Sequence, residues 1–146
     1  MSTFNGSSYI REQISSIQEQ THSSWVLLIR DDGSTDDTVE IIQEYIDTDK
    51  RISMVNGENQ NIGTAKSFNT LMNIAIESNF DYLMFCDQDD IWEPWKIEKT
   101  LQLVLDTENN QSPGTPILAH TDLMVVDSNL KLISSSYLKY QLMHNA

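Results

Sequence analysis

The residues best suited to chemistry are aspartates grouped directly behind apolar runs. The stretch "DYLMFCDQDDIWEPW" places Asp87, Asp89 and Asp90 within four positions, between "YLMFC" and Trp92. Carboxylates this close raise one another's pKa unless a cation is bound. Oxygen ligands without His or Cys suit Mg²⁺ or Mn²⁺. The pattern therefore favours a divalent-metal site, while acids at a strand end that only form a turn or cap a helix remain the simpler alternative.

A second acidic group follows an earlier apolar run in "WVLLIRDDGSTDD", where Asp31 and Asp32 come first. An EF-hand loop is a poor match because Gly33 comes too early. The aspartyl phosphatase pattern needs an acid where Arg30 stands. Neither G-x-x-x-x-G-K-[ST] nor G-x-G-x-x-G occurs. A Ser-His-Asp triad stays open, but no nucleophile elbow is present and His120 is the only histidine of interest.

Composition restricts the partners. Acidic residues outnumber basic ones 22 to 9, for a net charge of -13. Such a field repels nucleic acid and anionic lipid, and it repels nucleotides unless a cation intervenes. Cys86 is the single cysteine, so no internal disulfide can form, and its apolar surroundings predict a buried, inert thiol. No apolar run approaches the ~20 residues of a membrane helix, and no signal segment opens the chain, so we expect a soluble intracellular protein with no direct membrane insertion by this part.

Helical and strand patterns alternate along the chain. Residues 1–4 resemble the end of a first strand, and 109–116 reads as a loop. The expected helices are 7–21, 36–46, 64–78 and 94–108. The expected strands are 25–29, 52–55, 82–86, 117–120 and 123–127, followed by "LKLIS" (130–134) and a polar tail.

This alternation predicts one α/β domain over residues 1–146, with a mostly parallel sheet and helices on both faces. In such sheets ligands bind at the carboxyl ends of the strands. Both acidic groups and the segment "STFNG" fall at these ends. We therefore expect them to form a single site.

Four segments together resemble the family 2 glycosyltransferases, which have the GT-A fold. They occur in order as "STFNGSSYIREQISSIQEQT", "DDGSTDDT", "NIGTAKSFN" and "DQDDIWEPWKIEK". "DQDDIW" and "HTDLMVVDSNL" are most similar to the bacterial branch that builds capsular and O-antigen polysaccharides, including rhamnosyltransferases. The resemblance implies sugar transfer, with inversion, from a UDP- or dTDP-sugar donor to a hydroxyl of a saccharide or lipid-linked saccharide acceptor.

The resemblance also implies residue roles. Thr3, Phe4 and Asn5 would line the nucleotide pocket, with Phe4 standing where tyrosine is commoner. Asp32 would accept a hydrogen bond from the imide N–H of uracil or thymine, and Asp31 would shape the same turn.

Further along the chain, Gly63 and Lys66 would lie near the base or the phosphates. Asp87 and Asp89 match the Asp-x-Asp motif of the family. Asp89 and Asp90 would hold ribose and the Mn²⁺ or Mg²⁺ ion.

The sequence departs from the family pattern at both ends. Family members begin with a longer apolar strand and continue well beyond this C-terminus, so we expect a donor-binding part truncated at both ends. Their general base is usually an acid in the later region, so we expect the base to lie outside this sequence. Asp122 is the weaker candidate for that role. The whole enzyme is expected in the cytoplasm, reaching the inner face of the cell membrane only through missing regions.

Two rival functions remain. A non-catalytic acidic module that binds a metal or a carbohydrate explains the aspartates and tryptophans but not "DDGS". A sugar-nucleotidyl transferase would open with a glycine-rich, arginine-containing loop, which this sequence lacks.

Overall fold

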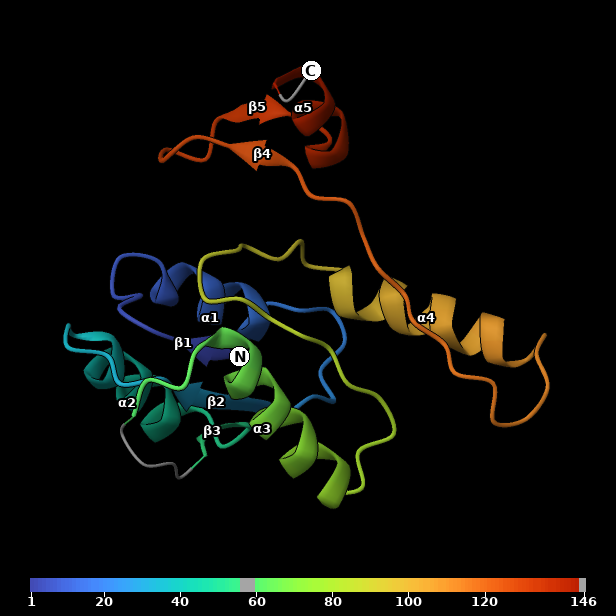
Figure 1. Ribbon diagram of the computed structural model, residues 1–146, viewed down its shortest axis with the longest axis horizontal. Coiled ribbons are helices and arrows are strands. Elements are labelled where there is room, and N and C mark those ends of the chain that lie inside the picture. Colours follow the sequence, from blue (N-terminus) through green and yellow to red (C-terminus); the bar gives the residue numbers. More distant parts are fainter. Residues whose placement is uncertain (56–59, 145–146) are drawn as a thin grey trace. The chain divides into compact units, whose positions relative to one another are not determined.

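The computed structural model describes residues 1–55 and 60–144 (Figure 1). The chain divides into two compact units, Met1–Leu101 and Gln102–Ala146. The first unit contains β1 (Ser2–Thr3), α1 (Ile10–Gln18), β2 (Leu27–Asp31), α2 (Thr38–Thr48), β3 (Ile52–Met54) and α3 (Thr64–Glu77). Helix α4 (Lys96–Glu108) begins in the first unit and ends in the second.

The first unit is built on a parallel sheet of order β1-β2-β3. Ser2 pairs with Arg30, and Leu27 pairs with Ile52. The expected parallel sheet and the stub of a first strand are therefore confirmed. Since all three strands run the same way, the loops after β1 and β2 leave from one edge.

Alternation along β2 gives the sheet two covered faces. Leu27 and Ile29 belong to the main hydrophobic core with isoleucines of α1, α2 and β3. Arg30, one position on, bonds to Ser67 of α3. Helices thus cover both faces, as expected. The core isoleucines of the helices are Ile10, Ile14, Ile17, Ile41 and Ile42, spaced so that each helix presents one apolar stripe, and Ile29 and Ile52 belong to the strands.

The expected buried strand at 82–86 is wrong. Tyr82–Cys86 is not a strand, and only Cys86 is buried, while Phe85 is 62% exposed. A strand needs a neighbour to satisfy its backbone. In the described parts of the chain, the sheet ends at β1, which has two residues and pairs with β2. The apolar composition was right for a strand, but no strand is paired with it here.

Burial of Cys86 is confirmed. Its Sγ lies 2.7 Å from Gln13 Nε2, and burial raises the pKa of the thiol to about 11. A thiol that stays protonated at neutral pH is a poor nucleophile.

The second unit holds a small hairpin and a helix. β4 (Val125–Val126) pairs antiparallel with β5 (Leu132–Ser134). β4 lies within the strand expected at 123–127, and β5 lies in the segment 130–134, for which no strand was expected. Asp127 closes the turn, because its Oδ1 accepts from the N–H groups of Asn129 and Lys131. The expectation of a strand at 117–120 is wrong, because these residues form no strand.

The polar tail, for which no helix was expected, forms α5 (Tyr137–His144). Ser136 Oγ accepts from the Lys139 N–H at 3.1 Å, which is the pattern of a serine N-cap. That serine was the overlooked sequence signal. Among the described helices, none has the length and apolarity needed to cross a bilayer.

Candidate functional site

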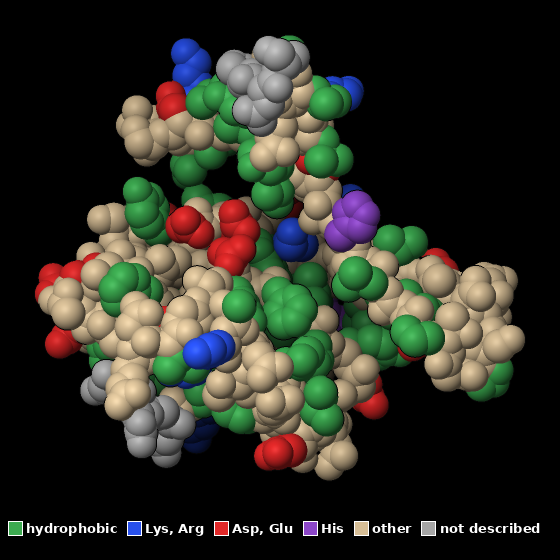
Figure 2. Space-filling view, viewed as in Figure 1, with side chains coloured by type: hydrophobic (Ala, Val, Ile, Leu, Met, Phe, Trp, Pro, Cys, Tyr) green, Lys and Arg blue, Asp and Glu red, His purple; other side chains and the backbone are tan. Residues whose placement is uncertain are grey.

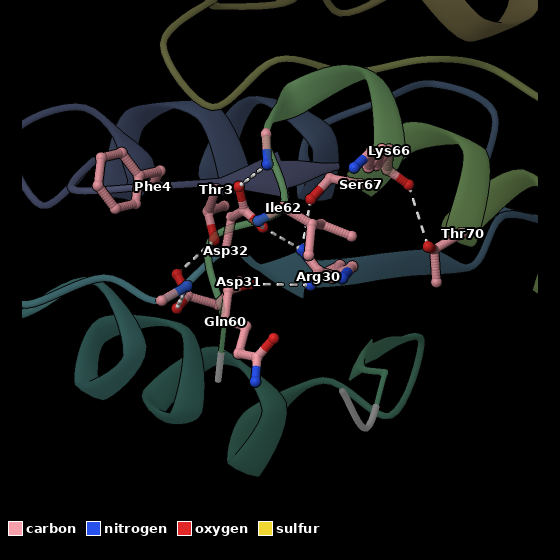
Figure 3. A network of polar contacts seen from close by, with 12 residues as sticks. Thr3, Phe4, Arg30, Asp31, Asp32, Gln60, Ile62, Lys66, Ser67 and Thr70 are labelled. Carbon is pink, nitrogen blue, oxygen red and sulfur yellow. Dashed lines mark hydrogen bonds and ion pairs between the residues drawn. The ribbon is translucent and has the colours of Figure 1, made fainter. Parts of the chain in front are cut away.

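Asp31 ties the ends of β1 and β2 together (Figure 3). Its Oδ2 accepts from the N–H groups of Gly33 at 3.0 Å and Ser34 at 2.8 Å. Its Oδ1 accepts from Thr3 Oγ1 at 2.9 Å. Such an aspartate turn satisfies local backbone donors. The turn-shaping role expected for Asp31 matches these bonds.

Asp32 is 3% exposed and lies at the centre of a buried polar network (Figure 3). Its Oδ1 accepts from Arg30 Nη1 at 2.5 Å and from Ile62 N at 2.8 Å, and its Oδ2 accepts from Gly63 N at 2.8 Å. Burial acts to raise the pKa of Asp32, but these hydrogen bonds and the Arg30 charge outweigh it, so its pKa lies below the ordinary value. Asp32 is therefore charged at neutral pH.

Arg30 joins Asp32 to Ser67 of α3. Arg30 Nη1 also donates to Ser67 Oγ, and the Arg30–Asp32 ion pair is almost wholly buried. Sequence reasoning treated Arg30 only as the reason to reject a phosphatase motif. A basic residue two positions before a strand-end aspartate was the available signal.

Asn5 shapes the loop after β1. Its φ is 48°, a left-handed conformation that asparagine tolerates better than most residues. Its N–H donates to Ser34 Oγ at 2.8 Å, and its Oδ1 accepts from Thr35 N at 2.8 Å. The side chain of Asn5 is thus engaged with the neighbouring loop.

The acidic loop Asp87–Asp90 is held by a buried polar stripe on α1 and just after it. Gln13, Ser16 and Gln20 lie at helical spacing, and all three are buried. Gln13 contacts Cys86, Ser16 Oγ accepts from Trp92 N at 3.0 Å, and Gln20 Nε2 donates to Glu93 O at 2.9 Å. The stripe therefore holds the chain on both sides of the acids.

A cavity of about 360 Å³ opens between these loops. It contains five of the predicted site residues, namely Thr3, Phe4, Asp32, Asp87 and Asp89, together with Ser2, Thr64 and Gln88, which were not predicted. The other predicted residues, Asn5, Asp31, Gly63, Lys66 and Asp90, are not among those that line it. Gly63 is nonetheless bound to Asp32, and Asp31 to Thr3.

Negative charges in the acidic loop repel one another at Asp90. Burial, followed by the charges of Asp87 and Asp89, raises the pKa of Asp90, and Lys96 only partly opposes this. Figure 2 shows acidic side chains gathered on one face, beside exposed hydrophobic ones. An added cation would relieve the repulsion.

The aspartate oxygens at the cavity suit a cation whose remaining ligands come from a bound molecule and water. Within residues 1–55 and 60–144, no group of three or more His, Cys, Asp or Glu side chains forms a metal cluster. Mg²⁺ commonly uses one or two carboxylates together with substrate phosphates and water rather than a full protein cage. Two or three neighbouring aspartates at a cavity therefore fit a divalent ion shared with an anionic ligand.

Asp122 is a poor candidate for a base. Hydrogen bonds from Ser136 and from the Leu123 backbone lower its pKa. A lower pKa makes a carboxylate a weaker proton acceptor.

The model for glycosyl transferase family 2 matches residues 1–120. The chain belongs to this family. It is 35% identical over 111 residues to the dTDP-rhamnosyl transferase RfbG of Shigella flexneri, an alignment that covers 75% of the chain and 38% of RfbG. It is 34% identical over 112 residues to WfgD of Escherichia coli, named as a UDP-Glc:alpha-D-GlcNAc-diphosphoundecaprenol beta-1,3-glucosyltransferase, over 77% of the chain and 41% of WfgD.

The fold agrees with the family. Residues 1–349 of TarS from S. aureus, solved in complex with UDP, superpose with a TM-score of 0.62 at 20% identity. The match covers 89% of the chain and 41% of that TarS fragment. The GT-A fold expected from the sequence is confirmed, and the chain spans about two fifths of the length of these relatives.

Proposed function

We propose that the chain is the donor-binding part of a metal-dependent glycosyltransferase of bacterial cell-surface polysaccharide synthesis. It would take a UDP- or dTDP-sugar and transfer the sugar, with inversion, to a hydroxyl of a saccharide or lipid-linked saccharide. The supporting observation is a single cavity lined at once by the β1 loop, by Asp32 and by Asp87 and Asp89. Family membership and the donors named for RfbG and WfgD point the same way.

One end of the cavity suits a nucleobase. The ring of Phe4 is 44% exposed and so is available for stacking. A carboxylate offers about four acceptor positions, and the three hydrogen bonds that the described residues donate to Asp32 leave one on Oδ2. That position could accept the imide N–H of uracil or thymine. We place Asn5, Asp31 and Gly63 in support of this end, and Lys66 near the base or phosphates.

The other end suits a diphosphate. Asp87 and Asp89 would contact the nucleotide, and Asp89 with Asp90 would hold Mn²⁺ or Mg²⁺. The ion, when bound, would neutralise charge on the departing nucleotide, a contribution of several kcal/mol. Without it, three carboxylates repel the donor.

The general base and any membrane contact are proposed to lie outside residues 1–146. We propose that residues 1–146 act as one donor-binding domain and that the general base lies in sequence beyond it. We also propose that the reaction takes place on the cytoplasmic side, with any membrane contact made by other regions.

The test is calorimetric titration of UDP and dTDP, with Mn²⁺ and with EDTA. Metal-dependent binding predicts that Mn²⁺ lowers the dissociation constant of at least one of the two nucleotides by about tenfold or more. This change equals about 1.4 kcal/mol of binding free energy. Uridine, which lacks the diphosphate, is the control and should not respond to Mn²⁺. Equal affinity for both nucleotides in Mn²⁺ and EDTA would refute the proposal, and Mn²⁺ binding with no effect on nucleotide would favour a non-catalytic metal-binding module.

A further inference from the structure

Gln88, in the middle of the acidic loop, forms a double hydrogen bond with the backbone of Phe4. Phe4 N donates to Gln88 Oε1 at 2.9 Å, and Gln88 Nε2 donates to Phe4 O at 3.1 Å. The amide side chain satisfies a donor and an acceptor of one residue, as a neighbouring strand would. These two residues are 84 positions apart, so the bond joins the loop after β1 to the loop between Asp87 and Asp89.

Gly6 provides independent support for the same contact. A Cβ atom at Gly6 would collide with the carboxamide of Gln88. Gly6 does not have a positive φ, so its backbone conformation is open to alanine. Alanine at this position would therefore push the carboxamide, the far end of a flexible side chain, away from its bonds to Phe4.

We propose that Gln88 is a positioning residue that fixes Phe4 relative to Asp87 and Asp89. This proposal rests on the function proposed for the cavity. A nucleotide donor spans that cavity, with its base at Phe4 and its diphosphate at the acids, so both ends bind well only if their separation is set in advance. Gln88 lines the cavity between the two ends and bonds directly to one of them.

The first experiment tests the contact without any ligand. Gly6→Ala, Gln88→Ala and the double variant are unfolded with urea and compared with the parent. Displacing the Gln88 carboxamide from its bonds to Phe4 predicts that Gly6→Ala lowers the folding equilibrium constant by about threefold or more in the parent and by clearly less in Gln88→Ala. Equal effects in both backgrounds would overturn the steric part of the proposal.

Amide hydrogen exchange adds a local readout. The Phe4 N–H should exchange faster in Gln88→Ala than in the parent, because its hydrogen-bond acceptor is removed. We call the double hydrogen bond between Gln88 and the Phe4 backbone the clamp. Unchanged protection of the Phe4 amide would show that the clamp does not form in solution.

The second experiment asks whether the clamp serves binding. Gln88→Ala should raise the dissociation constant of UDP in Mn²⁺ by about tenfold and that of uridine by less than about twofold. The reason is that only the diphosphate ligand needs both ends of the cavity. Gln88→Met keeps the side-chain length and removes both hydrogen bonds, so it replaces the alanine variant if that fails to fold. Gln43→Ala, which removes an exposed glutamine bonded to Asp47 on α2, is the matched control and should bind as the parent does.

The outcomes separate the clamp from the proposed function. Equal weakening of UDP and uridine would mean that Gln88 is merely structural and would overturn its positioning role. A parent that binds no nucleotide would refute the proposed function and the role of Gln88 in binding together, while a non-additive Gly6–Gln88 cycle would still establish the contact.

Discussion

Asp90 is the residue at which metal binding and stability are expected to oppose each other. Its pKa is raised, so the folded chain favours its neutral form. The stability it contributes is therefore present below the ordinary aspartate pKa of about 3.9 and is lost as the pH rises through the raised value. At pH 7 the ionised side chain destabilises the loop.

Asp90→Asn should consequently raise the melting temperature in EDTA by about 1–2 °C, as expected for about 0.5 kcal/mol at a half-exposed charge. The same substitution should reduce the melting-temperature gain produced by Mn²⁺ with UDP. Thermal unfolding under the two conditions checks both signs, with the exposed Asp47→Asn as control. A variant that loses stability in EDTA and keeps the full Mn²⁺ and UDP response would contradict the assignment.

Asp32 has the opposite pH behaviour because its pKa is lowered in the folded chain. Asp32→Asn leaves the buried Arg30 charge without its partner, which costs about 3–5 kcal/mol at neutral pH. The stability that ionised Asp32 supplies is present above about pH 4 and fades as the pH falls through its lowered folded value. Urea unfolding should therefore show a large difference between parent and variant at pH 7 and a smaller one at pH 3. A difference independent of pH would show that packing, rather than charge, accounts for the loss.

At the scale of elements, α1 is more than a cover for the sheet. Its apolar stripe packs in the core, while Ser16 supplies the acceptor for the buried N–H of Trp92. Ser16→Ala leaves that N–H unsatisfied, which costs about 1–3 kcal/mol. Urea unfolding measures the cost, and hydrogen exchange at Trp92 locates it in the loop.

Ser78→Ala is the control for this prediction. It removes an exposed hydroxyl bond to Ile74 O and should change stability by less than about 0.5 kcal/mol. Equal losses for both serines would mean that the bond to Trp92 contributes nothing beyond a general effect of removing a hydroxyl.

Periodicity was sufficient for helices α1 to α4, but it failed for α5 and for the strands expected at 82–86 and 117–120. Helix α3, for example, was predicted at 64–78 and lies at Thr64–Glu77, because its apolar spacing is a local property. A strand depends on a partner that composition does not reveal, so Tyr82–Cys86 was assigned wrongly. Helix α5 was missed because its apolar stripe is weak and its start signal is a single serine.

Some residues of the candidate site could be predicted because aspartates directly after apolar runs stand out in the sequence. Asp32 directly follows β2, whereas Asp87 and Asp89 line the same cavity although no strand precedes them. Bonds from Gln13 and Ser16 of α1 to the residues on either side hold their loop. Gln88 and Arg30 were missed because their roles depend on partners distant in sequence, Phe4 and Ser67. Trp92, noted as an aromatic beside the acids, is buried in the core.

At the scale of the whole molecule, the charge of -13 dictates how salt should act on nucleotide binding. In EDTA an anionic ligand approaches an anionic protein, and added salt screens their repulsion, since the Debye length falls from about 30 Å at 0.01 M to about 10 Å at 0.1 M. UDP should therefore bind about two- to threefold more tightly in EDTA as NaCl rises over that range. Uridine should be insensitive to NaCl, and UDP with Mn²⁺ should weaken, because salt then screens an attraction. Calorimetric titration at the two salt concentrations distinguishes these cases. UDP binding in EDTA that weakens with salt would reveal a cationic pocket, with Lys66 the first residue to test, and would remove the electrostatic need for a metal.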